Sequence, residues 1–315
     1  MLLQKAQNDA PFAIPRNLDT VLMNPFMDIA ARFWDTPRYN AAKLCYQSMR
    51  TIDDLIDNHK ASGSEISQSE KRKLTATVHE WIEAINNGSS RNPSQKQLIE
   101  AIREFQIPVK LWQRFSESMI YDIHHNGFET FPMFLKYAEG AAIAPASIFT
   151  HLCGVIKERE GYKAPPFDID GIAKPAGLFC YLVHIIRDFQ QDQHDNLNYF
   201  ANDLMAENGL DIAKLKQIAA GDEITLGFRN LVKKYHTFAE YHRQKTRSAL
   251  DNISKHLEPR YRLSLEIVYN LYLLVFERID IQNGKFTTAE LLPSQQEIKN
   301  RLDKTISSFD STRRL

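Results

Sequence analysis

A helical spacing of apolar residues continues through nearly the whole chain, and it constrains the fold more than any other feature of the sequence. Residues that interrupt helices are sparse, with 12 glycines and 13 prolines among 315 residues. Together with other polar residues they gather in four stretches, at 58–69, 86–94, 157–171 and 282–294. Alternating β-branched runs beside tight turns do not recur. The sequence therefore predicts an all-α fold.

These helices are predicted to form one domain. Apolar helical segments flank 157–171, so we interpret that stretch as an interhelical loop, and no repeat or low-complexity linker divides the chain. We expect a single all-α domain over 1–315, with a short polar segment at about 1–20. Three capping boxes, in which a serine and a later Glu or Gln each satisfy a backbone amide, predict helix starts at Ser67, Ser94 and Ser294.

Composition and charge exclude several classes of protein. Hydrophobic residues make up 43% of the chain, which is too apolar for disorder. Lys and Arg number 39, as do Asp and Glu, so no basic excess favours nucleic acid as a partner. The three cysteines are far apart and form no CxxC, which argues against a disulfide framework and a zinc site. With no secretory signal and no apolar run of ~18 residues, we expect a cytoplasmic protein without a transmembrane segment.

The most informative motif is a pair of aspartates that occurs twice at helical spacing. Asp53 and Asp57 are four residues apart, as are Asp188 and Asp192, and an arginine precedes each pair (Arg50 and Arg187). Residues at this spacing lie on one face of a helix, where like charges cost a few tenths of a kcal/mol (~0.2–0.5). Both pairs adjoin apolar segments, so partial burial is expected. A single pair of this kind is also typical of a solvated helix face.

Buried carboxylates need a partner, a proton or a metal ion. Hard oxygen ligands suit Mg²⁺, which typically takes one or two carboxylates, several waters and phosphate oxygens of a substrate. Two such pairs, each beside an arginine, favour a diphosphate held through bridging Mg²⁺. The arginines would then meet its remaining oxygens.

The motifs together resemble the squalene/phytoene synthase family. Residues 46–57 (YQSMRTIDDLID) are similar to its first aspartate motif, and 185–192 (IIRDFQQD) to its second. The segment 134–142 lies where the family has a tyrosine-containing helix, and 272–286 is a looser match. The resemblance implies an isoprenoid-synthase-type helical bundle in which the two aspartate helices face each other across a central cavity.

The resemblance also implies an activity and residue roles. Two prenyl diphosphates, farnesyl or geranylgeranyl, would condense head-to-head through a cyclopropylcarbinyl diphosphate to a squalene- or phytoene-type product, with release of pyrophosphate. The metal ligands would be Asp53, Asp57, Asp188 and Asp192. The implied substrate-binding residues are Arg50, Arg187, Tyr199, Tyr272 and His184, and the implied catalytic residues are Tyr46 and Tyr137. Each tyrosine is equally compatible with a core position.

Several positions depart from the family pattern. His184 stands where Asn is usual, and Tyr181 where Gln is common. Leu197-Asn198 lacks the basic residue that usually precedes Tyr199. Ile143 and Ala146 replace glycines, so we expect Pro145 to supply a helix break there.

Other functions stay open at this point. A head-to-tail prenyl transferase or a terpene cyclase shares the fold class, and a catalytically silent relative would act as an assembly or scaffold protein. A di-iron bundle would need Glu-x-x-His, which the sequence lacks. Donor chain length, NADPH use and oligomeric state also stay open. The expected lipid product is compatible with peripheral contact with a membrane.

Overall fold

The computed structural model describes residues 21–22, 24–61 and 66–311, so the predicted polar segment at 1–20 lies outside the described residues. The first half contains α2 (Phe26–Ala31), α3 (Thr36–Ala61), α4 (Gln68–Asn86), α5 (Pro93–Glu104), α6 (Val109–His124), α7 (Phe131–Ala138), the π-helix η1 (Glu139–Ile143) and α8 (Ala144–Gly154). Strands β1 (Ile156–Glu158) and β2 (Gly161–Lys163) follow. The second half contains α9 (Asp170–His194), α10 (Asn202–Glu207), α11 (Ile212–Ala219), α12 (Leu226–Ile253), the 3-10 helix η2 (Ser254–His256), α13 (Pro259–Phe276), α14 (Thr288–Leu291) and α15 (Gln295–Ser311). The all-α prediction is confirmed.

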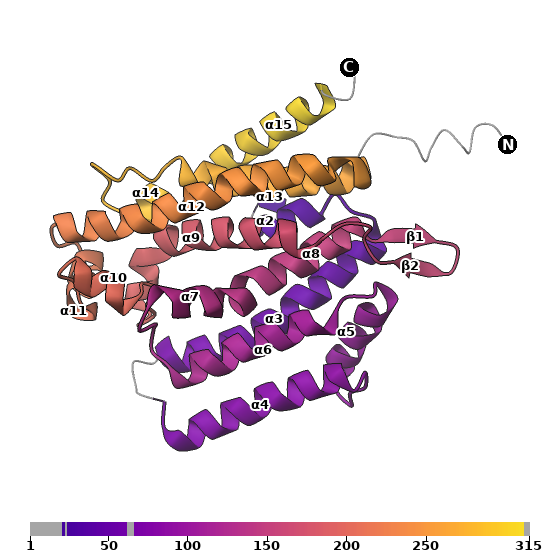
Figure 1. The fold of residues 1–315 in the computed structure, drawn as a ribbon, viewed down its shortest axis with the longest axis horizontal. Coiled ribbons are helices and arrows are strands. Elements are labelled where there is room, and N and C mark those ends of the chain that lie inside the picture. The colour runs from indigo at the N-terminus through magenta and orange to yellow at the C-terminus, as the bar shows by residue number, and fades with distance from the viewer. Residues whose placement is uncertain (1–20, 23, 62–65, 312–315) are drawn as a thin grey trace.

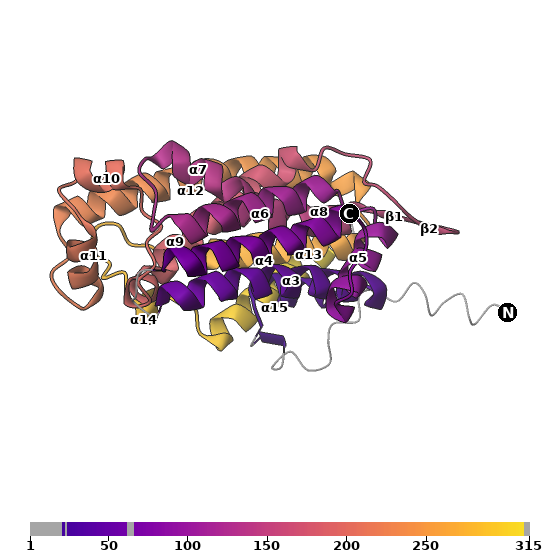
Figure 2. The same cartoon turned by 90° about the horizontal axis from the view of Figure 1, so that it is seen from below.

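The long helices run roughly along one direction and stack side by side (Figure 1). Helix α9 lies inside the stack and packs on α8, α12 and α13, while α3 packs on α5, α6 and α8. Helix α8 therefore contacts both α3 and α9, the two helices that carry the aspartate pairs. The view from below shows α3 and α4 in front of the other long helices (Figure 2). In the described part of the chain, no helix combines the length and the apolar character that crossing a membrane requires.

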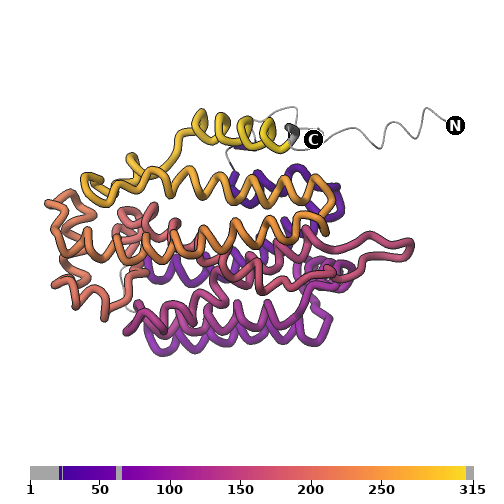
Figure 3. The backbone as a smooth tube through the Cα atoms, turned by 45° about the horizontal axis from the view of Figure 1, so that its top comes forward, coloured from indigo at the N-terminus to yellow at the C-terminus, as the bar shows by residue number. Residues whose placement is uncertain are grey.

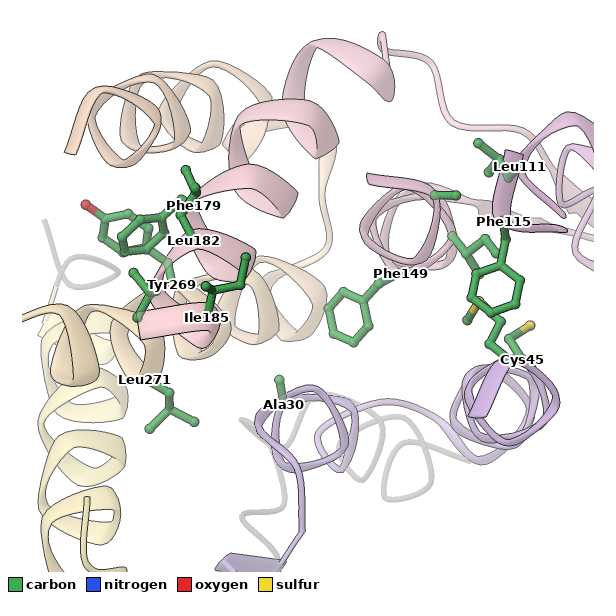
Figure 4. Packing of buried hydrophobic residues seen from close by; sticks show 14 of the residues in the cluster. Ala30, Cys45, Leu111, Phe115, Phe149, Phe179, Leu182, Ile185, Tyr269 and Leu271 are labelled. Atoms are coloured by element: carbon green, nitrogen blue, oxygen red, sulfur yellow. The ribbon is translucent and has the colours of Figure 1, made fainter. Parts of the chain in front are cut away.

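A continuous hydrophobic core fixes α3 and α9 from their outer sides. Phe179, Leu182 and Ile185 of α9 lie near Tyr269 of α13 (Figure 4), and the rings of Phe179 and Tyr269 are 5.8 Å apart. On the other side, Cys45 of α3 lies close to Phe115 of α6 in the same view. Because apolar side chains anchor these outer faces, the polar faces of α3 and α9 turn inward.

The helical segment from α7 to α8 corrects one expectation. Pro145 does not break the helix, because the chain continues from α7 through η1 into α8 with Pro145 in the first turn of α8. A π-turn shifts the hydrogen-bond pattern, which accommodates a residue without an N–H group. Gly140 is required in η1, since a Cβ there would lie 2.0 Å from the carbonyl oxygen of Arg114.

Two further predictions need correction. Residues 157–171 are not only a loop, because β1 and β2 pair as an antiparallel hairpin that projects from one end of the molecule (Figure 3). Gly161, at φ +117°, supplies a turn conformation that other residues rarely adopt. Ser94 does not cap α5, because the Asn92 side chain accepts from the Ser94 and Gln95 amides instead. The capping boxes at Ser67 and Ser294 are confirmed.

Candidate active site

Helix α3 presents the first aspartate motif on its inner face. Its other face carries Met49, Ile52 and Ile56 into the core, which fixes the rotation of the helix. Arg50 pairs with Asp53 at 2.6 Å and also with Asp54, so its guanidinium lies along this helix.

Both motif aspartates of α3 have raised pKa values. Burial raises the pKa of Asp53 to about 6, although the positive charge of Arg50 opposes the shift. Burial, followed by the negative charges of Asp53 and Asp122, raises the pKa of Asp57 to about 7. One oxygen of Asp57, Oδ1, is buried without a hydrogen-bond partner. A buried carboxylate oxygen without a donor is unfavourable unless a proton or a cation reaches it.

The second motif, on α9, is arranged differently. Asp188 accepts two hydrogen bonds of 2.6 Å from Arg187, and the Nε2 atom of His184 lies 3.1 Å from the same carboxylate. Although burial works against ionisation, the hydrogen bonds from Arg187, followed by electrostatic interactions with His184 and Arg187, hold the pKa of Asp188 below its usual range. The negative charge of Asp188 is therefore already compensated by Arg187, a residue of the same helix.

His184 is neutral in this arrangement. Its Nδ1 atom lies 2.9 Å from a nitrogen of Arg187, which can only donate, so the proton of the ring belongs on Nε2 and points at Asp188. Burial and the charge of Arg187 lower the pKa of His184. The residue that departs from the family pattern thus helps to orient Arg187 and Asp188.

Asp192 connects the two motifs in space. Burial raises its pKa to about 8, and the negative charges of Asp188 and then Asp57 add to the shift. Asp57 is on α3 and Asp192 is on α9, so carboxylates from the two motifs lie close enough to repel each other. The prediction that the aspartate helices face each other agrees with this coupling. We call the region around Asp53, Asp57, Asp122, Asp188 and Asp192 the acid chamber.

Three buried tyrosines lie near the carboxylates of the acid chamber. Burial raises the pKa of Tyr137, Tyr181 and Tyr199, and the charge of Asp122 contributes to each shift. The rings of Tyr181 and Tyr199 are 6.1 Å apart in an edge-on arrangement, and Tyr137 lies 5.0 Å from Phe128. Their hydroxyl groups therefore remain protonated.

The two remaining predicted residues lie near the arginines. Tyr272 of α13 is near Arg187, Asp188 and Tyr46, and burial raises its pKa. Phe26 packs edge-on against its ring at 5.3 Å. Tyr46 is 39% exposed, and partial burial raises its pKa although the charge of Arg50 opposes the shift. The structure thus places Tyr46 near Arg50 of the first motif and Tyr272 near Arg187 of the second.

Sequence reasoning missed two charged residues of the chamber. Asp122 of α6 is buried, and the ammonium nitrogen of Lys60 lies 2.5 Å from its Oδ1 atom. Lys60 is three residues after Asp57 and seven after Asp53, a spacing that places it on the same helical face. Asp122 follows the buried run of Phe115 and Met119 at helical spacing, so an acid on the buried face of α6 was visible in the pattern.

The donor set fits Mg²⁺. Within the described ranges, no three His, Cys, Asp or Glu side chains converge closely enough to hold one ion. Mg²⁺ does not need such a cage, because it usually binds through one or two carboxylates with water and phosphate oxygens. The unpartnered Oδ1 of Asp57 and the raised pKa of Asp192 mark the carboxylates that lack a positive charge.

Comparison with known proteins agrees with this geometry. The sequence model of the squalene/phytoene synthase family matches residues 28–298. The chain belongs to this family. A phytoene synthase from Cereibacter sphaeroides is 24% identical over 169 residues, a match that covers 53% of this chain and only 45% of that relative. The two aspartate motifs found in the sequence are therefore motifs of a squalene/phytoene synthase family member.

Solved structures show that the fold is the all-α isoprenoid-synthase fold of this family. A dehydrosqualene synthase crystal structure is similar at a TM-score of 0.68 and 17% identity, covering 98% of this chain and 99% of that one. The squalene synthase HpnC from Alicyclobacillus acidocaldarius is similar at 0.55 and 11% identity, with 79% and 96% covered. YisP from Bacillus subtilis is similar at 0.52 and 14% identity, with 85% and 99% covered.

Proposed function

We propose that this chain catalyses the Mg²⁺-dependent, head-to-head condensation of two prenyl diphosphates. The donors would be farnesyl or geranylgeranyl diphosphate, joined through a cyclopropylcarbinyl diphosphate to a squalene- or phytoene-type product. The observation that carries the proposal is that Asp57 of α3 and Asp192 of α9 lie close enough for the charge of Asp57 to raise the pKa of Asp192, while the buried Oδ1 of Asp57 has no hydrogen-bond partner. Membership of the squalene/phytoene synthase family supports the reaction class.

Asp53, Asp57, Asp188 and Asp192 are the residues that would hold Mg²⁺. When bound, the ion supplies positive charge that stabilises a departing diphosphate. Placing carboxylates with raised pKa values around a cation favours their ionised forms, so binding the ion releases protons.

Arg50 and Arg187 would bind the oxygens of the diphosphate that face away from the carboxylates. Arg187 is 14% exposed and already fixed by Asp188 and His184, so little side-chain entropy is lost when it donates to a substrate. Arg50, at 47% exposed, lies at the chamber's edge, where a diphosphate would enter. Tyr46 and Tyr272, near these arginines, would donate to the same group.

The buried tyrosines would control the steps after ionisation. An allylic cation needs an environment that excludes water, and the faces of Tyr137, Tyr181 and Tyr199 attract positive charge. As the second double bond attacks, closure of the cyclopropane ring releases one C–H proton. The tyrosine hydroxyls are too weakly acidic to be ionised bases, so they would orient the released diphosphate, which takes that proton.

Incubation with Mg²⁺ and each prenyl diphosphate, with and without NADPH, tests the proposal when pyrophosphate and products are measured. We expect pyrophosphate release and a C30 or C40 product. Asp57→Asn and Asp192→Asn should each reduce turnover by about 10³-fold, since each removes a carboxylate that would hold the ion that stabilises the departing diphosphate. Asp303→Asn, on the exposed surface of α15, is the matched control and should leave turnover unchanged. A chain that binds no prenyl diphosphate would instead support an assembly or scaffold protein.

A further inference from the structure

Lys60 is an unusual residue to find inside an acid chamber. It lies in the last turn of α3, with a side chain that is 9% exposed. Its Nζ atom donates to Oδ1 of Asp122 at 2.5 Å and to the carbonyl oxygen of His125 at 3.1 Å. Burying a lysine is unfavourable unless its charge is paired, so the position demands an explanation.

The charge of Lys60 acts on three carboxylates from two helices. It favours the ionised forms of Asp53 and Asp57 on α3 and of Asp122 on α6. For Asp122 the hydrogen bond adds to the charge, although burial still leaves its pKa raised. Lys60 is therefore an electrostatic part of the acid chamber.

The cations of the chamber are distributed unevenly. Arg50 pairs with Asp53, Arg187 with Asp188 and Lys60 with Asp122. Asp57 and Asp192 have no such partner among the residues that the structure describes, and their carboxyls have the raised pKa values of about 7 and about 8. Asp57 and Asp192 are therefore the two of the five acids in the acid chamber that remain available to an external cation.

A small pocket lies beside Lys60. Lys60 and Asp122 line a pocket of about 20 Å³ together with Asn126, Asn198 and Tyr199. Such a volume holds on the order of one water molecule. Removing the ammonium group of Lys60 would leave the carboxylate of Asp122 without its paired charge beside this space.

We infer that the ammonium group of Lys60 pairs with Asp122 and so prevents a divalent ion from binding to that carboxylate. Divalent ions are thereby confined to the other carboxylates of the acid chamber. Lys60 is a positioning residue, because it acts through Asp122. The inference rests on the proposed function, because that function makes those carboxylates metal ligands. It does not depend on which prenyl diphosphate is the substrate. It predicts that removal of the ammonium group creates one additional divalent-cation site between α3 and α6.

Mn²⁺ titration of the full chain without substrate, followed by electron paramagnetic resonance of free Mn²⁺, tests this inference. We expect Lys60→Met to bind one more Mn²⁺ per chain than the wild type. Lys60→Arg should bind the wild-type number, because it conserves the charge. Lys60→Met with Asp122→Asn should lose the additional ion. If Lys60→Met fails to fold, as judged by a thermal melt, Lys60→Gln is titrated in its place.

Two results would overturn the inference. One is an unchanged Mn²⁺ stoichiometry in the folded, charge-neutral Lys60 variant. The other is an additional ion that persists after Asp122→Asn, since a general loss of structure rather than Asp122 would then provide the site. Failure of the proposed function is separate, because it appears as no pyrophosphate release by the wild type with any prenyl diphosphate, whatever the Mn²⁺ titration shows.

Discussion

Helix α3 carries two groups of charged residues whose environments are opposite. Near its start, Arg38 is 1% exposed and donates to the carbonyl oxygens of Leu152, Cys153 and Val155, where α8 ends. Its guanidinium carbon also lies 3.9 Å from the centre of the Tyr261 ring. Near the other end, Asp57 lies close enough to Asp192, another acid, for its charge to raise the pKa of Asp192.

This difference distinguishes a structural charge from a functional one. The positive charge of Arg38 meets the negative end of a helix, an aromatic face and the carboxylate of Asp35, 3.6 Å from its Nε atom, so the fold compensates the charge although that Nε makes no hydrogen bond. The carboxylates of the acid chamber meet like charge, which the fold alone does not satisfy. Groups held in this way are typical of binding and catalytic sites, where a ligand supplies what is missing.

The largest change in the free energy of unfolding is expected when Arg38, the structural charge near the start of α3, is replaced. Arg38→Met leaves the α8 carbonyl oxygens without their donor and should lower the free energy of unfolding by about 3–5 kcal/mol. Urea denaturation measures this change. Arg32→Met is the control, because Arg32 is 37% exposed in its pair with Asp28 and should cost at most about 1 kcal/mol. Equal losses for the two variants would show that Arg38 is not a structural charge.

A smaller change in the free energy of unfolding, of opposite sign, is expected for a variant in the acid chamber. A carboxyl group whose pKa is raised on folding binds more protons in the folded state, so stability falls as pH rises from about 4 towards the folded pKa values of about 7 and 8. Asp57→Asn should therefore raise the free energy of unfolding by about 1 kcal/mol at pH 8 in the absence of Mg²⁺, and change it little at pH 5.

Urea denaturation at both pH values measures the difference, with Asp54→Asn as the matched control. Asp54 is 50% exposed and lies outside the coupled pair, so its variant should change stability by less than about 0.5 kcal/mol at either pH. A destabilised Asp57→Asn protein at pH 8 would mean that Asp57 is a satisfied structural group like Arg38.

The smallest effect is expected at His184. Its ring is 43% exposed and neutral, and an asparagine can also accept from Arg187 and donate towards Asp188. His184→Asn should therefore change turnover by less than about tenfold and stability by less than about 0.5 kcal/mol. Steady-state kinetics and urea denaturation check both values. A loss as large as that of Asp192→Asn would place His184 in direct contact with the diphosphate.

Local spacing was sufficient to predict the parts of the site that lie on one helix. The four-residue interval of Asp53 and Asp57, and of Asp188 and Asp192, determines that each pair shares a face, and the family motifs around them imply that the faces meet. The all-α fold follows equally from apolar spacing that continues over most of the chain.

Partners brought together by tertiary packing could not be read from the sequence. The pairing of Lys60 with Asp122 depends on how α3 lies against α6, and nothing local to either residue encodes it. The hairpin of β1 and β2 was missed because three-residue strands are too short to show alternation. The continuation through Pro145 was missed because the π-turn that permits it depends on close packing of Gly140 against α6.

Carboxyl ¹³C NMR titration of aspartate-labelled protein without Mg²⁺ tests most directly whether Asp57 and Asp192 face each other. We predict that Asp192 titrates near pH 8 in the wild type and at a lower pH in Asp57→Asn, because removal of the negative charge of Asp57 relieves the repulsion. An Asp192 that titrates near the ordinary value of about 4, unchanged by Asp57→Asn, would contradict the shared chamber and the function proposed for it.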